Sequence, residues 1–116
     1  MKNIDGPLVS IIIHSFDRFQ YLLNAIESIK NQTYKNYELI LINDGSNEKE
    51  YYEYNFPNFI KKIDIKRNNT PQWQGSRQAL INIGVEQSNG EFIALLDDDD
   101  CWLPNKLEIQ ISKMLE

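Results

Sequence analysis

EFIALLDDDDCW, residues Glu91 to Trp102, is the stretch that decides the fold of this chain. Its first half, Phe92 to Leu96, is continuously apolar, which is typical of a parallel β-strand covered on both faces. Its second half is a run of aspartates, Asp97 to Asp100, placed directly after the strand. In open α/β sheets, ligands bind at the carboxyl ends of the strands. The stretch therefore predicts a buried strand that delivers carboxylates to a binding site.

Segments of the same kind alternate along the rest of the sequence. Short runs rich in β-branched and aromatic residues predict three more strands, at Val9–Ile13, Tyr37–Ile42 and Phe59–Ile65. Apolar residues at helical spacing predict three helices, at about Phe19–Ile29, Gln74–Gln87 and Leu103–Met114, and a short polar helix is expected from about Ser46 to Tyr54. This β-α alternation favours a mainly parallel sheet with right-handed crossovers, in a Rossmann-like, three-layer α/β/α fold.

The helices carry further expectations about individual side chains. Ser15 or Asp17 could cap the first helix, since hydroxyl and carboxylate oxygens accept hydrogen bonds from free backbone N–H groups there. The third helix is expected to bury Ala79, Leu80 and Ile83. The last helix should form one apolar face from Leu103, Leu107, Ile111 and Met114.

Composition limits the class of partner. The chain has 116 residues, enough for one domain or part of one, and its net charge is −5. This charge argues against binding to nucleic acid or to an anionic membrane surface. Cys101 is the single cysteine, which excludes an internal disulfide and a zinc site built on several thiolates.

The sequence has neither a long apolar span nor a signal peptide pattern. Leu8 to Ile13 is too short to cross a bilayer. We therefore expect a cytoplasmic protein, and attachment to the inner face of a membrane through regions outside this sequence stays open.

The aspartate run offers two interpretations. Asp97 and Asp99 lie two residues apart, so on an extended segment they face the same way and could share Mg²⁺ or Mn²⁺ with phosphate oxygens. Alternatively, the run is a solvated acidic turn at the start of the next helix. Asp44, which ends a neighbouring strand, could accept from the N3–H of a pyrimidine or serve as an ordinary turn residue beside Gly45. No glycine cradle for phosphate is present in the sequence.

Three motifs in order resemble those of a known family. They are VSIIIHSFDR (Val9–Arg18), NYELILINDGSNE (Asn36–Glu48) and NIGVEQSNGEFIALLDDDDCW (Asn82–Trp102). From Leu8 onward the chain resembles the nucleotide-sugar-binding half of the family 2 glycosyltransferases, whose fold is called GT-A. The resemblance implies a nucleotide-sugar donor, with UDP-sugars favoured, a Mn²⁺ or Mg²⁺ cofactor, and a saccharide or lipid-linked acceptor.

The resemblance also implies roles for individual residues. Asp44 matches the acid that contacts the nucleotide base, and Phe16 matches the aromatic residue that lines the base site. Asp97 matches the first acid of the D-x-D motif, near the ribose, and can share the metal with Asp99, the metal-bridging acid. Asp98, the spacer between them, is counted with the nucleotide-binding residues.

Four positions depart from the family pattern or leave its meaning open. His14 replaces the family proline after the first strand, and we interpret it as a structural hydrogen bonder. Ile81 replaces an arginine, and Arg77, one helical turn earlier, could substitute for it in nucleotide binding. Arg18 could reach the nucleotide or pair with a surface acid.

The resemblance places the catalytic base of an inverting transfer in an acceptor half beyond Glu116, so no catalytic residue is assigned. We expect a lead-in over residues 1–7 that is flexible and a partial GT-A domain over residues 8–116, inactive by itself and free to form a homodimer through uncovered apolar surface. Two alternatives are a non-catalytic nucleotide-binding or interaction module of the same fold, and a receiver or phosphoryl-transfer domain. The latter would need an acid pair after the first strand, where only Asp17 is found.

Overall fold

The computed structural model describes residues 6–66 and 77–115. These residues form a four-stranded sheet in the order β3-β2-β1-β4, and every neighbouring pair is parallel. The strands are β1 (Val9–Ser15), β2 (Tyr37–Asn43), β3 (Ile60–Asp64) and β4 (Phe92–Leu95). The predicted parallel sheet is therefore confirmed, with boundaries that differ from the expected ones by one or two residues.

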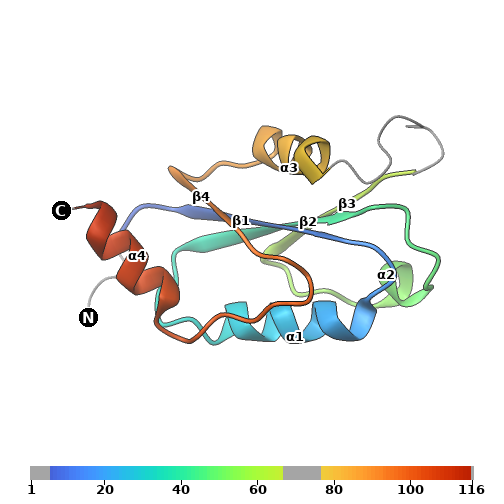
Figure 1. Cartoon of the computed structure of the whole chain (residues 1–116), viewed down its shortest axis with the longest axis horizontal. Helices are drawn as coiled ribbons and strands as arrows, with labels where there is room; N and C mark the ends of the chain where they lie inside the picture. Colours follow the sequence, from blue (N-terminus) through green and yellow to red (C-terminus); the bar gives the residue numbers. More distant parts are fainter. Residues whose placement is uncertain (1–5, 67–76, 116) are drawn as a thin grey trace.

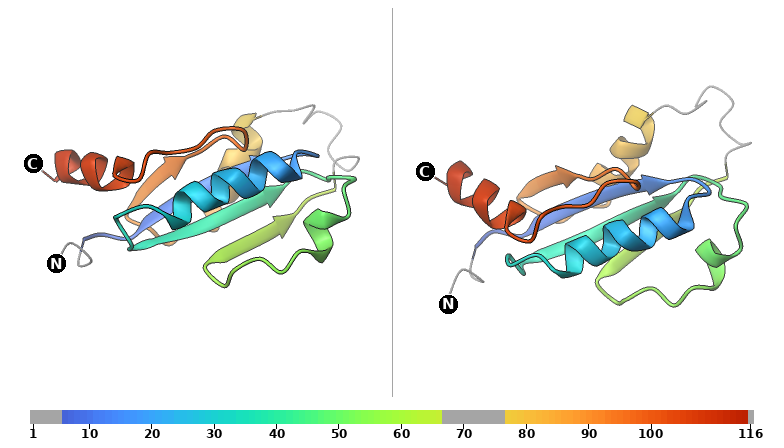
Figure 2. Two further views of the ribbon diagram at one scale, coloured as in Figure 1. Left: turned by 90° about the horizontal axis from the view of Figure 1, so that it is seen from below. Right: turned by 60° about the horizontal axis from the view of Figure 1, so that its bottom comes forward.

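Helices cover both faces of the sheet. α1 (Phe19–Lys30), α2 (Glu50–Glu53) and α4 (Lys106–Met114) lie on one face, and α3 (Arg77–Glu86) lies on the other (Figures 1 and 2). This arrangement confirms the three-layer α/β/α fold. The second helix is shorter than expected, and residues 74–76 of the predicted third helix lie outside the described residues. None of the helices in the described ranges is long and apolar enough to span a membrane.

The core lies on both sides of β1 and β2, because alternate side chains of a strand point to opposite faces. Ile11, Ile13 and Leu41 pack on the α1 face, in a cluster that includes Leu22, Ile26, Leu107 and Ile111. Ile12, Ile40 and Ile42 pack on the α3 face with Leu80. The two central strands are thus buried from both sides.

β4 differs from the prediction. It was expected to be covered on both faces, but Ile93 and Leu95 are 42% and 43% exposed. β4 is the edge strand beyond β1, while α3 contacts β1 and β2. Ile93 and Leu95 lie beside Ser10 and Ile12 in the register, on the face where α3 sits too far across the sheet to cover them. An apolar run alone does not distinguish a central strand from an edge strand.

The start of α1 is capped from a distance. We expected Ser15 or Asp17 as the cap, but the helix has no side-chain cap from its own N-terminal residue, Arg18. Instead, the Phe19 N–H donates to Glu48 Oε1 over 3.0 Å. The loop after β2 therefore fixes the start of the helix that follows β1.

The buried faces of α3 and α4 also differ in part from the expected ones. α3 buries Leu80 as predicted, together with Ile81 and Gly84, while Ala79 and Ile83 are half-buried. A Cβ on Gly84 would lie 2.7 Å from Ile12 Cγ2, so this glycine lets α3 lie close to β1. α4 buries Leu107 and Ile111, but Leu103 and Met114 are 75% and 56% exposed.

Glu38 joins three segments at the amino-terminal end of the sheet. Its Oε2 accepts from Ser10 Oγ over 2.5 Å and from the Asn89 N–H over 2.6 Å. Its burial alone would raise the pKa of Glu38, but the hydrogen bonds from Ser10 and Asn89 and the charge of Lys61 outweigh burial and lower the pKa below 4.5. The ionised form of this carboxyl therefore stabilises the fold.

Replacing Glu38 by Gln should lower the free energy of unfolding at pH 7 by about 1–2 kcal/mol, because hydrogen bonds to a charged acceptor become hydrogen bonds to a neutral one. A lowered pKa contributes stability above the unfolded-state value near 4.5, and this contribution disappears as the pH falls through the lower folded-state value. Urea unfolding of both proteins should therefore show a difference at pH 7 that shrinks below pH 4.5.

A matched control for this prediction is Glu27→Gln, since the Glu27 side chain is 62% exposed on α1. It should change the stability by less than about 0.5 kcal/mol at either pH. A Glu38→Gln effect that stays constant with pH would contradict the assigned role of the charge.

Candidate functional site

A step in the carboxyl edge of the sheet creates the site. β4 stops at Leu95, which pairs with Ile12, whereas β1 continues beside β2 as far as Ser15. The chain leaving β4 makes one more bond to β1, from the Leu96 N–H to the Ile12 carbonyl over 3.1 Å, and then turns away. The residues at the end of β1 therefore border an opening that the segment after β4 closes on one side.

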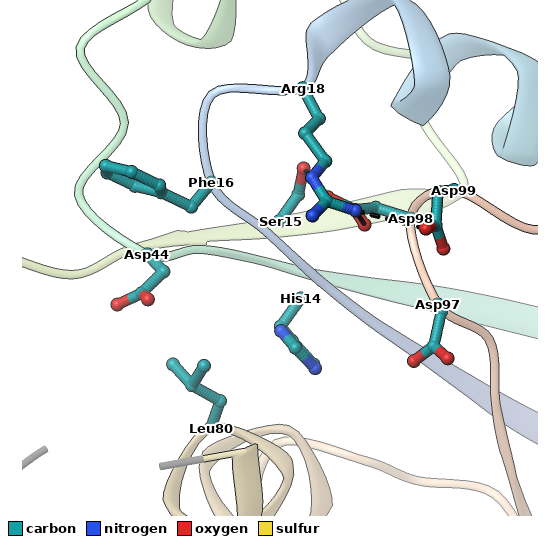
Figure 3. Close-up of a pocket in the computed structure, with 9 residues that line it drawn as sticks. All are labelled: His14, Ser15, Phe16, Arg18, Asp44, Leu80, Asp97, Asp98 and Asp99. Atoms are coloured by element: carbon teal, nitrogen blue, oxygen red, sulfur yellow. Dashed lines mark hydrogen bonds and ion pairs between the residues drawn. The ribbon is translucent and has the colours of Figure 1, made fainter. Parts of the chain in front are cut away.

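A pocket of about 390 Å³ occupies this opening. Its volume lies in the range of roughly 300–1,000 Å³ that is usual for small-molecule sites. The lining residues come from the ends of three strands and from α3: His14, Ser15, Phe16, Arg18, Asp44, Leu80, Asp97, Asp98 and Asp99 (Figure 3). All the predicted site residues except Arg77 thus line one pocket.

The pocket has two chemically different sides. Phe16 and Asp44 lie together on one side, and Asp97 and Asp99 lie on the other (Figure 3). Asp44 is 2% exposed, and its backbone N–H donates to the Ser15 carbonyl over 2.9 Å. One side therefore pairs an aromatic ring with a carboxylate, and the other is acidic.

The aspartates after β4 form a turn rather than the extended segment we expected. The Asp100 N–H donates to the Asp97 carbonyl over 3.1 Å. The turn nevertheless gathers carboxylates, since one oxygen each from Asp97, Asp99 and Asp100 lie within 4.8 Å of one another. Carboxylate oxygens are the ligands that Mg²⁺ and Mn²⁺ prefer, so this donor set fits such an ion. The sequence did not single out Asp100 as a ligand, and its carboxylate completes this donor set.

Asp98 has a different environment from its neighbours. It is 9% exposed, accepts from Ser15 Oγ over 2.8 Å, and lies 3.6 Å from Arg18 Nη1. It thereby ties the acidic turn to the end of β1. The motif alone showed Asp98 as a spacer. Its contacts make it the most buried and most firmly held of the four aspartates in the run Asp97–Asp100.

Two arginines form ion pairs with two acids of the turn. Arg18 Nη1 lies 3.1 Å from Asp99 Oδ2, and Arg77 Nη2 lies 3.0 Å from Asp97 Oδ1. All four side chains are about half exposed, so each ion pair contributes less than about 1 kcal/mol. Arg18 thus pairs with acids of the site itself, and Arg77 reaches this region from the first turn of α3 although it does not line the pocket.

Tyr51 supports the site from behind, and the sequence did not reveal this role. Its hydroxyl lies 2.6 Å from Ser15 Oγ and accepts from the Arg18 N–H over 2.9 Å. Its ring is fully buried and meets Phe19 edge-on. Burial raises the pKa of Tyr51, so the hydroxyl stays neutral.

Asp17 holds two loops of the site together. Its Oδ1 accepts from the backbone N–H groups of Asn47 and Glu48 over 2.7 and 2.9 Å, and its own N–H donates to Ser46 Oγ over 3.0 Å. Its φ angle of 51° places it in the left-handed region, which aspartate tolerates better than most residues. The loop after β1 is therefore bonded to the loop after β2.

The fold and the pocket define the class of this protein as a Rossmann-like α/β domain with an acidic ligand pocket at the carboxyl edge of its sheet. The sequence model of the family described as "Glycosyl transferase family 2" matches residues 10–116. The chain therefore belongs to glycosyltransferase family 2, as the three motifs predicted.

Curated relatives agree with this assignment. An "Uncharacterized glycosyltransferase" of Haemophilus influenzae is 43% identical over 95% of this chain and 43% of its own length. The protein named "UDP-Glc:alpha-D-GlcNAc-diphosphoundecaprenol beta-1,3-glucosyltransferase WfgD" of Escherichia coli is 34% identical over 97% of this chain and 43% of its own length. Across eight curated relatives, the chain spans between 15% and 43% of the length of the protein that it matches.

Solved structures share the fold. TarS of S. aureus, residues 1–349 in complex with UDP-GlcNAc, superimposes with a TM-score of 0.73 at 20% identity, covering 90% of this chain and 30% of TarS 1–349. The mannosyltransferase PcManGT of Pyrobaculum calidifontis, in complex with GDP-Man and Mn²⁺, gives a TM-score of 0.71 at 14% identity, covering 93% of this chain and 32% of that one. These likenesses confirm the expected GT-A type of fold.

Proposed function

We propose that this chain is the donor-binding part of a glycosyltransferase, and that its pocket binds a nucleotide-diphosphate sugar, preferably a UDP-sugar, together with Mn²⁺ or Mg²⁺. One observation carries the proposal: a single pocket has an aromatic ring and a buried carboxylate on one side and a cluster of acids on the other. A nucleotide sugar has the matching parts, a flat base with N–H donors at one end and an anionic diphosphate that binds divalent cations.

The side formed by Phe16 and Asp44 suits the base. Phe16 provides a ring beside the pocket, and Asp44 provides a carboxylate that could accept from the N3–H of uracil. The carboxylate is held in place, because the Asp44 N–H is bonded to β1 and the residue is almost fully buried. A fixed acceptor of this kind favours uracil over cytosine, whose N3 carries no hydrogen.

The acidic turn suits a metal-bound diphosphate. Asp97, Asp99 and Asp100 would hold the divalent ion, which when bound neutralises the charge on the departing diphosphate as a Lewis acid. Cation binding would also compete for the carboxylates that now pair with Arg18 and Arg77. Both exposed guanidinium groups could then turn to phosphate oxygens, which they bind well.

The chain's own part in transfer is to bind and orient the donor. We infer an inverting transfer to a saccharide or lipid-linked acceptor, in which an acceptor hydroxyl attacks the sugar and a base outside residues 1–116 takes its proton. The Escherichia coli relative is named as a glucosyltransferase with UDP-Glc as donor and GlcNAc-diphosphoundecaprenol as acceptor, and this name supports the proposed class of donor and acceptor.

Calorimetry with UDP tests the proposal. We expect UDP to bind the chain in the presence of Mn²⁺, and EDTA to weaken that binding by about 10-fold or more, because the diphosphate then meets an acidic turn without its cation. CDP is a matched control, since it has the same diphosphate and ribose. Binding of UDP that is unaffected by EDTA, or equal binding of CDP, would contradict the metal or the base assignment respectively.

A second measurement separates the enzyme from a non-catalytic module of the same fold. A polypeptide that joins this domain to an acceptor half should transfer sugar from a UDP-sugar or slowly hydrolyse it. Binding of UDP by such a polypeptide without transfer or hydrolysis of any of several UDP-sugars would favour the non-catalytic alternative.

A further inference from the structure

His14 occupies a central place in the pocket. It follows Ile12 by two residues on β1, so its side chain points to the same face of the sheet, toward Leu80 of α3. His14 and Leu80 both line the pocket, and His14 lies between Asp44 on one side and Asp97 on the other (Figure 3). Any ligand that reaches from Asp44 to the acidic turn must pass over this imidazole.

The imidazole has an unused hydrogen-bonding atom. His14 Nε2 is buried, and no residue in the described ranges hydrogen-bonds to it. We expected His14 to be a structural hydrogen bonder, and at Nε2 the structure contradicts that expectation. Most buried polar groups in proteins have a partner, because leaving one without a hydrogen bond is costly. Because His14 lines the pocket, a ligand that fills the pocket is the available source of a partner for Nε2.

We propose that His14 Nε2 makes this hydrogen bond with the nucleoside of the bound donor, and so helps to determine nucleotide affinity. The inference rests on the function proposed above and assigns a residue to it. The diphosphate is directed to the acids at one end of the pocket and the base to Asp44 at the other. The ribose that joins them therefore lies over His14. Ribose hydroxyls both donate and accept, so they match Nε2 in either neutral tautomer of the ring.

Because His14 is the single histidine of the sequence, its imidazole nitrogens give unambiguous signals in NMR spectra of the ¹⁵N-labelled chain without a histidine tag. Two titrations should be compared, each with Mg²⁺, which does not broaden the spectra as Mn²⁺ would. UDP is expected to shift the Nε2 resonance of His14. Pyrophosphate is expected to shift the backbone signals of the acidic turn and leave Nε2 in place.

The outcomes separate this inference from the proposed function. If UDP shifts the amide signals of Asp44 and Asp99 but leaves Nε2 unchanged, the nucleoside contact of His14 is overturned while donor binding stands. If pyrophosphate shifts Nε2 as much as UDP does, the nucleoside assignment is also overturned, because His14 then responds to the phosphate end. If UDP shifts no signal, the proposed function fails together with the inference.

Substitutions give a second, independent test. His14→Ala should weaken UDP binding by about 3- to 10-fold, the usual effect of losing one hydrogen bond. His14→Gln restores a side chain that can donate or accept, and it should recover part of that loss. Pyrophosphate binding should be the same in the parent and both variants. Equal UDP affinity of His14→Ala and the parent would overturn the proposal, and amide spectra of each variant check that the fold is retained.

Discussion

Replacing Asp97 and Asp99 together by asparagine should weaken UDP binding in the presence of Mn²⁺ by at least about 100-fold, since the loss of supporting residues alone often weakens metal binding 10- to 100-fold. The two changes remove two of the three carboxylates that lie within 4.8 Å of one another. They leave amide oxygens, which bind divalent cations far less well than carboxylates do. Calorimetric titration of the parent and the variant at equal Mn²⁺ concentration measures the loss.

The fold should tolerate this double substitution. Both side chains are about half exposed, and their ion pairs with Arg18 and Arg77 contribute little to stability. Glu86→Gln is a matched control, because it removes a charge from an exposed residue at the opposite end of α3 from Arg77. If the double variant binds UDP with an affinity within a factor of two of that of the unsubstituted chain, the acidic turn is ruled out as the metal site.

Tyr51→Ala should destabilise the chain severely, because it empties a position at the centre of the core. Deleting a fully buried aromatic side chain costs about 3–5 kcal/mol, a large part of the 5–15 kcal/mol that usually separates folded from unfolded states. Tyr51 also bonds Ser15 and the start of α1, so its loss removes one of the two partners of Ser15, whose hydroxyl also donates to Asp98. Urea unfolding followed by circular dichroism measures the change.

Two further variants show which part of Tyr51 matters. Tyr51→Phe keeps the ring and removes the hydroxyl, so it should cost about 1–2 kcal/mol and weaken UDP binding through Ser15 and Asp98. Tyr21→Ala removes a tyrosine that is 59% exposed on α1, and it should change stability by less than about 0.5 kcal/mol. If Tyr51→Phe matches the parent in both stability and UDP affinity, the hydroxyl does not organise the site.

Local pattern was sufficient to predict the sheet. Val9–Ile13 and Tyr37–Ile42 are runs of β-branched and aliphatic residues, and both form central strands with fully buried residues on each face. The ends of parallel strands meet at one edge, so the sequence alone could place Phe16, Asp44 and Asp97 together. The three motifs, taken in order, predicted the family that the comparison assigns.

Contacts between distant segments could not be predicted in this way. Ser15 and Asp98 are 83 positions apart, and nothing in either local sequence shows that their side chains meet. The same is true of the Tyr51 hydroxyl and of Glu48 at the start of α1. β4 was misjudged for a related reason: its composition is that of a central strand, while its exposure depends on where α3 packs.

The hydrogen bonds of Asp17 to Ser46, Asn47 and Glu48 affect how the pocket can move. They bond the loop after β1 to the loop after β2, and Glu48 of the second loop also holds the start of α1. These bonds restrict motion between the walls that carry Phe16 and Asp44, so we expect changes in the shape of the pocket to occur mainly on the opposite side. There Asp97 and Asp99 are held by exposed ion pairs that a cation can replace. We expect the part of the pocket that binds the base to be preformed in the free chain. The part that binds the diphosphate should change its conformation when the donor binds.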